Sequence, residues 1–158
     1  MLVPGVLETL QKLGSIVGST GLAAKTIELV HLRVSQINGC SVCLDLHSRQ
    51  LKRMNESETR MFAVAAWRDA PYFTPEERAA LALAEAATRM ADRPNPVPDE
   101  IWNEAAKYYD EKQLAGLVLA IANINVWNRV NVATGQVAGE WAQSEDAKKW
   151  LEREAMAH

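Results

Sequence analysis

Residues 28–47 read ELVHLRVSQINGCSVCLDLH, and this stretch predicts two helices joined by a tight turn. Its first part carries apolar residues at helical spacing, which favours a helix that ends at Asn38. Gly39 follows, and glycine readily adopts the left-handed conformation that terminates a helix. A second helix is expected from about Cys40 to Met54. The turn would fold the second helix back against the first.

The same stretch holds both cysteines of the chain and two of its three histidines. Cys40 and Cys43 lie three residues apart at the start of the expected helix, so they share a face and can form a disulfide with little movement. The backbone N–H groups and dipole of a first helical turn also stabilise a thiolate. His47 lies one turn after Cys43 and can exchange a proton with a sulfur. Glu28, on the preceding helix, is placed to orient His47 or to act as a base for a thiol.

Helical spacing of apolar residues continues through the rest of the chain, and no strand, hairpin or repeat pattern interrupts it. An amphipathic helix is expected near residues 6–17, and a long helix with apolar residues on more than one side is expected after Leu114. Residues 93–98, RPNPVP, are typical of a stiff connector. The fold prediction is all-α, with about seven or eight helices. Capping signals predict helix starts after Ser19 or Thr20, Asn55, Thr74, Asp110 and Ser144.

The composition is that of a globular domain. The chain has 158 residues, 48% of them hydrophobic and 23% charged, which suits one domain over residues 1–158 with a buried core. The net charge of -3 without a basic stripe argues against nucleic acid as a partner, and no apolar run is long enough to span a membrane. The N-terminus lacks a signal-peptide pattern, so a cytoplasmic location is expected. In that compartment a C-x-x-C pair is more often catalytic or metal-binding than a structural disulfide.

Several interpretations of the cysteine pair follow from the residues alone. A zinc site would need four ligands, which the two cysteines, His47 and Glu28 supply in number, although three of them share one helix, unlike most structural zinc sites. The cysteines are also compatible with small buried core residues. Covalent haem attachment needs a histidine directly after the second cysteine, where Leu44 stands. A thioredoxin-type site needs neighbouring strands, which the pattern does not predict.

His31 is the second histidine of the stretch. It follows Glu28 by three residues, a spacing that occurs in di-iron helical bundles. Such a bundle requires a second motif of the same kind, and we find none in the sequence. His31 is therefore expected to be a surface or intersubunit residue.

The spacing Glu28, eleven residues, Cys40-x-x-Cys43, three residues, His47 resembles the alkylhydroperoxidase D-like (AhpD-like) family within the carboxymuconolactone decarboxylase superfamily. The segment LRVSQINGCSVCLDLHS is similar to the core segment of that family. The resemblance continues through WRDAPYFTPEERAALALAEAATR and into LAIANINVWNRVNVATG, so it covers about residues 20–140. The combined spacing is far more specific than a C-x-x-C pair alone.

The resemblance implies a compact AhpD-like helical domain that oligomerises through its helices, commonly as a trimer or hexamer. It also implies a thiol-dependent peroxidase of the alkylhydroperoxide reductase type that serves antioxidant defence. Cys43 would be the peroxidatic cysteine, and Cys40 the resolving cysteine that is exposed to the reductant. Glu28 and His47 would form a proton relay. The best-studied members carry a further relay histidine where this chain has Val42. The decarboxylases proper lack the cysteine pair, so its presence argues against decarboxylation.

The expected substrate is a hydroperoxide. The expected reductant is an external dithiol, either a dihydrolipoyl group on an acyl-carrier partner or a thioredoxin-like protein. No bound cofactor and no metal is expected. Two alternatives use the same residues: a disulfide reductase or redox sensor that works through the C-x-x-C pair, and a non-enzymatic helical module with a structural metal at Cys40, Cys43 and His47.

Overall fold

The computed structural model describes residues 3–139 and 143, and within them the chain forms α-helices, one short 3-10 helix and no strands. The all-α prediction is confirmed for these residues. The helix expected after Ser144 lies outside them. The elements are α1 (Val6–Gly18), α2 (Ala24–Asn38), α3 (Ser41–Arg53), α4 (Glu58–Ala63), the 3-10 helix η1 (Val64–Ala66), α5 (Pro75–Thr88), α6 (Asp99–Ala106) and α7 (Glu111–Ala133).

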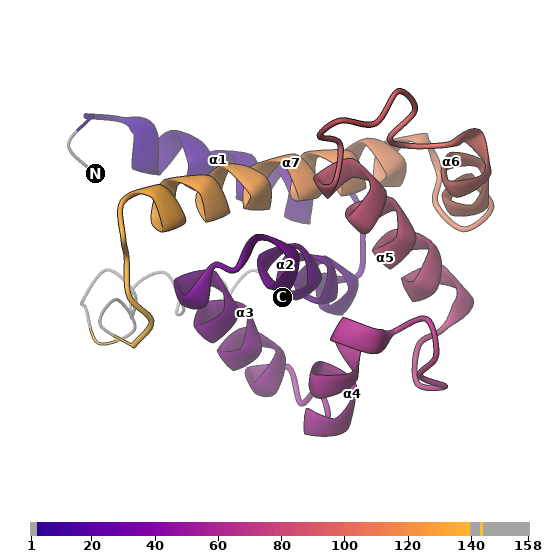
Figure 1. Ribbon diagram of the computed structural model, residues 1–158, viewed down its shortest axis with the longest axis horizontal. Coiled ribbons are helices and arrows are strands. Elements are labelled where there is room, and N and C mark those ends of the chain that lie inside the picture. The colour runs from indigo at the N-terminus through magenta and orange to yellow at the C-terminus, as the bar shows by residue number, and fades with distance from the viewer. Residues whose placement is uncertain (1–2, 140–142, 144–158) are drawn as a thin grey trace.

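Helix α2 is the central element of this arrangement (Figure 1). It packs against α3, α5 and α7, while α1 lies along α7. Leu29, Val30 and Val34 of α2 are at most 1% exposed, so the helix contributes to the core on more than one side. Burying each such side chain contributes roughly 1.5–3 kcal/mol, which makes α2 the main apolar anchor of the fold. None of the described helices is long and apolar enough to cross a membrane.

Buried amide side chains fix α7 against α2 and α5. Asn128 has no exposed surface; it donates a hydrogen bond to Ser35 Oγ at 3.1 Å and accepts one from Asn38 at 2.9 Å. Asn38 also donates to Asn125 at 3.0 Å, and Asn125 donates to Thr88 Oγ1 at 3.1 Å. Asparagine is a poor helix former, so these tertiary hydrogen bonds offset an unfavourable local preference. They hold α7 over the end of α2, where the reactive residues begin.

Two of the predicted helix starts have the expected geometry. The Thr74 side chain accepts a hydrogen bond from the backbone N–H of Glu77, and the Glu77 side chain accepts one from the backbone N–H of Thr74, which makes a capping box at the start of α5. Asp110 and Gln113 form the same reciprocal pair at the start of α7. These two predictions are confirmed, because both motifs are local and depend on sequence spacing alone.

The predicted caps at Ser19 or Thr20 and at Asn55 are wrong. The hydroxyls of Ser19 and Thr20 donate back to backbone carbonyls in the last turn of α1, both at 2.7 Å, and α2 begins only at Ala24, without a side-chain cap. Asn55 has a φ of 56° and lies in the turn after α3, whereas Ser57 caps α4. Short polar side chains can serve either end of a helix, so their presence alone did not fix the boundary.

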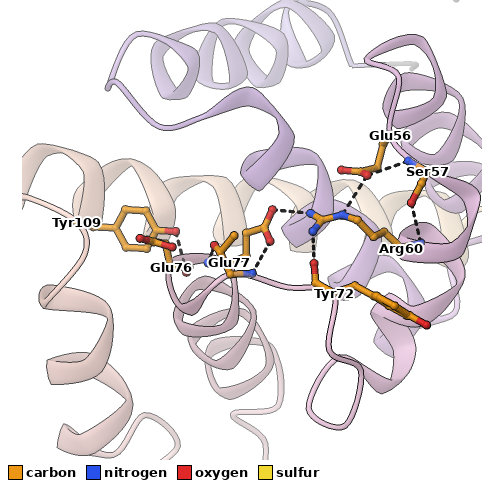
Figure 2. A network of polar contacts seen from close by, with 8 residues as sticks. Glu56, Ser57, Arg60, Tyr72, Glu76, Glu77 and Tyr109 are labelled. Atoms are coloured by element: carbon orange, nitrogen blue, oxygen red, sulfur yellow. Dashed lines mark hydrogen bonds and ion pairs between the residues drawn. The ribbon is translucent and has the colours of Figure 1, made fainter.

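A second polar network ties α4 to the beginning of α5 (Figure 2). Arg60 donates to the carboxylates of Glu77, at 2.6 Å, and Glu56, at 3.0 Å, and to the carbonyl oxygen of Tyr72. From the other side, the Tyr109 hydroxyl donates to the Glu76 carbonyl at 2.9 Å. These contacts hold the loop between η1 and α5, on the far side of α2 from α7.

Glu85 joins α5 to α2 at the centre of the molecule. Its buried carboxylate accepts hydrogen bonds from Arg33 Nε at 2.6 Å and from Trp67 Nε1 at 3.0 Å, and it also pairs with Arg68 and Arg89. Burial would raise the pKa of Glu85, but the hydrogen bonds from Arg68, Trp67 and Arg33 lower it. The ionised Glu85 carboxylate therefore links α5 to α2 through its ion pair with Arg33.

Replacing Glu85 should destabilise the protein strongly. Glu85→Ala leaves the guanidinium of Arg33 partly buried without its partner, and breaking a buried ion pair costs about 3–5 kcal/mol. The free energy of unfolding from urea denaturation at neutral pH would measure this loss. Glu104→Ala, which removes an exposed carboxylate paired with Lys107, is the matched control and should have little effect. Equal destabilisation by the two changes would contradict the central role of Glu85.

Candidate functional site

The two cysteines lie at the turn between α2 and α3. Gly39 ends α2 with a φ of 68°, in the left-handed region that the sequence pattern anticipates. Cys40 is the residue preceding α3, and its sulfur accepts a hydrogen bond from the Cys43 backbone N–H at 3.3 Å. The two sulfurs form a disulfide, and the Cα atoms are 5.4 Å apart, within the normal range for such a bond. The local backbone therefore accommodates the oxidised pair.

Glu28 and His47 form a buried pair across α2 and α3. His47 Nδ1 lies 2.8 Å from Glu28 Oε2, and the two residues are 5% and 7% exposed. An ionised carboxylate can only accept, so this contact makes Nδ1 the donor and leaves the His47 Nε2 lone pair available in the neutral ring. Such an imidazole, oriented by a carboxylate, can accept a proton through Nε2.

The environment of Glu28 keeps its carboxylate ionised. Burial would raise the pKa of Glu28, but the charge attraction of His47, its hydrogen bond to the carboxylate and the nearby His31 ring outweigh this effect and lower the pKa from 4.5 to about 2. The carboxylate thus stays negative at any pH where the protein would operate.

His31 lies on the other side of the same carboxylate. Its Nδ1 is 3.7 Å from Glu28 Oε1, and its ring centroid is 4.7 Å from that of His47. The side chain is only 15% exposed and both ring nitrogens are buried, so the prediction of a surface residue is wrong. One turn of α2 places it beside Glu28, and the packing of α3 and α7 covers it. Sequence spacing showed that His31 lies beside Glu28, but it could not show that α3 and α7 cover the His31 ring.

A cavity of about 370 Å³ opens above these residues, between α1, α2, α3 and α7. Its polar end is formed by Glu28, His31, Cys43 and His47. The rest of the wall is mainly apolar, and its larger side chains are Leu10, Val17, Ile27, Val42, Leu46, Ile124 and Trp127. Val42 is part of this apolar wall. A small apolar molecule would fit here with one polar group against the histidines and Cys43.

The two sulfurs differ in access. Both cysteines are buried in the same apolar core, with Cys40 1% and Cys43 3% exposed, but only Cys43 lines the cavity. The burial of Cys40 differs from the expectation that this sulfur is exposed to the reductant, although Gly39 and Ser41 of the same turn are exposed. Of the two cysteines, Cys43 is the one that a molecule in the cavity could reach.

Asn131 is a site residue that the sequence reasoning missed. Its Nδ2 lies 3.4 Å from Cys43 Sγ, and the residue lines the cavity from the last turns of α7. An amide N–H beside the sulfur would stabilise a thiolate there. The available signal was the recurrence of asparagine at positions 123, 125, 128 and 131 of one helix, where asparagine is unfavourable unless it has tertiary partners.

Comparison with known proteins identifies the family of the chain. Residues 4–86 match the sequence profile described as the carboxymuconolactone decarboxylase family. The chain belongs to this family. It is 42% identical over 113 residues to the uncharacterized protein YdfG of Bacillus subtilis, which covers 72% of this chain and 76% of YdfG. A shorter match, 42% identical over 50 residues, links it to the alkyl hydroperoxide reductase AhpD of Bradyrhizobium diazoefficiens and covers 31% of this chain and 28% of AhpD.

A solved structure gives the same fold. ATU0492 from Agrobacterium tumefaciens, a protein of unknown function with the provisional designation of an antioxidant defence protein AhpD, superposes with a TM-score of 0.80 at 30% identity. The match covers 86% of this chain and 92% of that one. The chain is thus an AhpD-like member of the superfamily. The structure brings Glu28, Cys40, Cys43 and His47 together, while the catalytic roles assigned to them stay predictions.

Glu28→Gln should destabilise the protein in a pH-dependent way. Because the folded pKa of Glu28 lies below its ordinary value of 4.5, the ionised pair contributes stability fully above about pH 4.5 and loses it as the pH falls toward about 2. The difference in unfolding free energy between parent and variant should therefore be largest near neutrality and shrink over that acidic range. Urea denaturation at several pH values would measure it. A difference that stays constant down to the lowest pH would contradict an ionised Glu28.

Proposed function

We propose that the protein is a thiol-dependent peroxidase that reduces organic hydroperoxides. The observation that carries the proposal is a C-x-x-C disulfide with Cys43 at the end of a largely apolar cavity, beside a buried Glu28–His47 pair. The likeness to an alkyl hydroperoxide reductase AhpD, although it covers 31% of this chain, supports the same reaction class. A redox pair, a proton acceptor and an apolar substrate pocket are the three parts such a reaction needs.

In the first step His47 removes the proton from the reduced Cys43 thiol, oriented by Glu28 through Nδ1. The Cys43 thiolate attacks the outer oxygen of the hydroperoxide, and the O–O bond breaks. Sulfur is oxidised to a sulfenic acid, and the peroxide is reduced to an alcohol. His47 returns its proton to the leaving alkoxide, so protons and electrons balance. The Asn131 amide, 3.4 Å from Cys43 Sγ, stabilises the thiolate before the attack.

In the second step the Cys40 thiol attacks the Cys43 sulfenic acid. A disulfide forms and water leaves; no further oxidant is needed, because the dithiol loses two electrons in total and the hydroperoxide took them in the first step. The backbone already holds the two residues at disulfide distance, with Cα atoms 5.4 Å apart. This proximity makes Cys40 the resolving cysteine, in a step that needs no large rearrangement.

An external dithiol then regenerates the enzyme. Because Cys43 lines the cavity and Cys40 does not, the first thiol of the reductant attacks Cys43 and releases the Cys40 thiol. The second thiol of the reductant then attacks the mixed disulfide and releases the Cys43 thiol. The reductant leaves as a disulfide, and both cysteines of the protein are reduced. This route favours a slender dithiol such as a dihydrolipoyl group over a thioredoxin-like protein, which needs an exposed disulfide. The cytoplasm keeps such reductants reduced.

We further propose that the active form is a trimer or hexamer assembled through helices. Val118, Leu119 and Val126 of α7 are exposed apolar residues on the outer side of a helix whose inner side packs on α2. Covering them with a neighbouring subunit would remove apolar surface from water. Sedimentation of the purified protein would measure the number of subunits.

The sulfur assignment predicts different outcomes for the two cysteine variants. The reduced parent protein should form one Cys40–Cys43 disulfide for each hydroperoxide consumed, measured by thiol titration and mass spectrometry. Cys43→Ser should abolish this consumption, because the nucleophile is lost. Cys40→Ser should consume one equivalent and stop with a sulfenic acid on Cys43. Full turnover by Cys43→Ser would overturn the assignment, and faster reaction with a disulfide than with a hydroperoxide would favour a disulfide reductase.

His47→Gln should slow the reaction of the reduced protein with hydroperoxide by about 10²–10⁴-fold, the usual contribution of a general acid–base group. Stopped-flow measurement of the second-order rate constant would test this. Ser48→Ala changes the adjacent position of α3, where the hydroxyl bonds only to the Asp45 carbonyl, and should leave the rate unchanged. If His47→Gln and Ser48→Ala react at the parent rate across the neutral pH range, His47 has no part in proton transfer.

A further inference from the structure

The peroxidase mechanism leaves His31 without a task. Both of its ring nitrogens are buried, and neither has a hydrogen-bond partner among the described residues. A buried donor or acceptor without a partner costs about 1–3 kcal/mol, so a histidine kept in this state calls for a physical reason. The side chain lines the cavity, which means that a bound species could supply the missing contact.

The neighbours of His31 suggest what that species is. One ligand atom each from Glu28, His31 and His47 can be chosen so that all three lie within 4.8 Å of one another. Two of the spacings are shorter: His31 Nδ1 lies 3.7 Å from Glu28 Oε1, and His47 Nδ1 lies 2.8 Å from Glu28 Oε2. Ligands about 2.1 Å from a tetrahedral zinc ion are roughly 3.4 Å apart, so an ion would replace the proton between His47 Nδ1 and Glu28 Oε2, and the groups would move slightly apart around it.

We propose that Glu28, His31 and His47 form a binding site for a divalent transition-metal ion of the zinc class, open toward the cavity. Two imidazoles and one carboxylate suit such an ion, whereas calcium and magnesium prefer sites built from oxygen atoms. Three protein ligands with a free position toward a cavity are typical of zinc sites that bind a further molecule, and not of closed structural sites. The ion would supply His31 with the partner that it lacks.

The surroundings of the three groups agree with this assignment. A metal ion needs a carboxylate and imidazoles that offer a lone pair, and all three groups line the same cavity. The other titratable group on the cavity wall is Cys43, because α1 and α7 contribute only uncharged residues to it. No neighbouring lysine or arginine on the described wall would repel a cation.

This site differs from a metal site built on the cysteines. In the oxidised protein the two sulfurs are bonded to each other, so a thiolate ligand is absent while the three N and O ligands remain. The inference does not rest on the peroxidase proposal, since binding is measured without peroxide. Its consequence for that proposal is direct: an ion that takes Glu28 and His47 competes with the proton that they would transfer.

The decisive experiment titrates the metal-free, disulfide-bonded protein with Zn²⁺ by calorimetry. One ion should bind per chain. His31→Phe keeps a flat ring, and Glu28→Gln keeps the side-chain shape; each should weaken binding by about tenfold or more, because even partners outside the ligand shell change metal affinity by 10–100-fold. Glu100→Gln removes one negative charge from the exposed surface of α6 and should bind Zn²⁺ like the parent.

A second measurement guards against variants that fold poorly. The Cys40→Ser/Cys43→Ser double variant should still bind one Co²⁺, with the intense visible absorption of a four- or five-coordinate ion and no sulfur charge-transfer band. Binding that requires reduction and disappears in this double variant would place the metal on the thiols and overturn the proposal. Unchanged Zn²⁺ binding in both His31→Phe and Glu28→Gln would also overturn it, as would the absence of binding to the oxidised parent.

Discussion

The structure depends on the burial of one carboxylate in the middle of its central helix. Removing an ion from water costs several kcal/mol, so Glu28 can lie inside the protein only if charged or hydrogen-bonding groups meet it. The partners come from two places: His31 from the next turn of α2, and His47 from α3. The second partner requires that α3 fold back along α2, and the left-handed turn at Gly39 makes that possible. The same turn that folds α3 back along α2 therefore supplies the buried Glu28 carboxylate with its partner, His47.

The surrounding helices convert this pair into a defined cavity. Helix α7 is held over α2 by the buried amides of Asn125 and Asn128, and α5 is held against α2 by the carboxylate of Glu85. Both networks require specific hydrogen-bond geometry. They therefore fix how far α7 and α5 are shifted along α2, as well as how closely they pack against it. With α7 fixed, Asn131 reaches Cys43 and Trp127 closes the apolar wall. Ligand cavities of this kind are usually largely preformed.

The parts that sequence could predict are those that depend on neighbours along the chain. The helical class, the turn at Gly39 and the capping boxes at Thr74 and Asp110 follow from local pattern, and all four are present. The contact between Glu28 and His47 was also predictable from the sequence, because a tight turn between two helices brings their facing sides together. Family resemblance, and not spacing, distinguished the roles of the two sulfurs.

The parts that sequence could not predict depend on which distant element covers a given face. The burial of His31 and Cys40 depends on packing by other helices, and the contact of Asn131 with Cys43 joins residues 88 positions apart. Periodicity shows that a face is apolar but does not show what lies on it. The misplaced caps at Thr20 and Asn55 have a different cause, since a short polar side chain can satisfy the end of one helix as well as the start of the next.

The position of the disulfide at the first turn of α3 has a consequence for signalling. The backbone on both sides is held by hydrogen bonds, from Cys40 N–H to the Ser35 carbonyl and from Leu44 N–H to the Cys40 carbonyl, and neither contact uses a sulfur atom. A cross-link between residues three apart also closes a very short loop, so it constrains little of the unfolded chain. Oxidation and reduction can then alternate with little difference in outward shape. A partner protein would then find almost no surface change by which to recognise the redox state of such a pair.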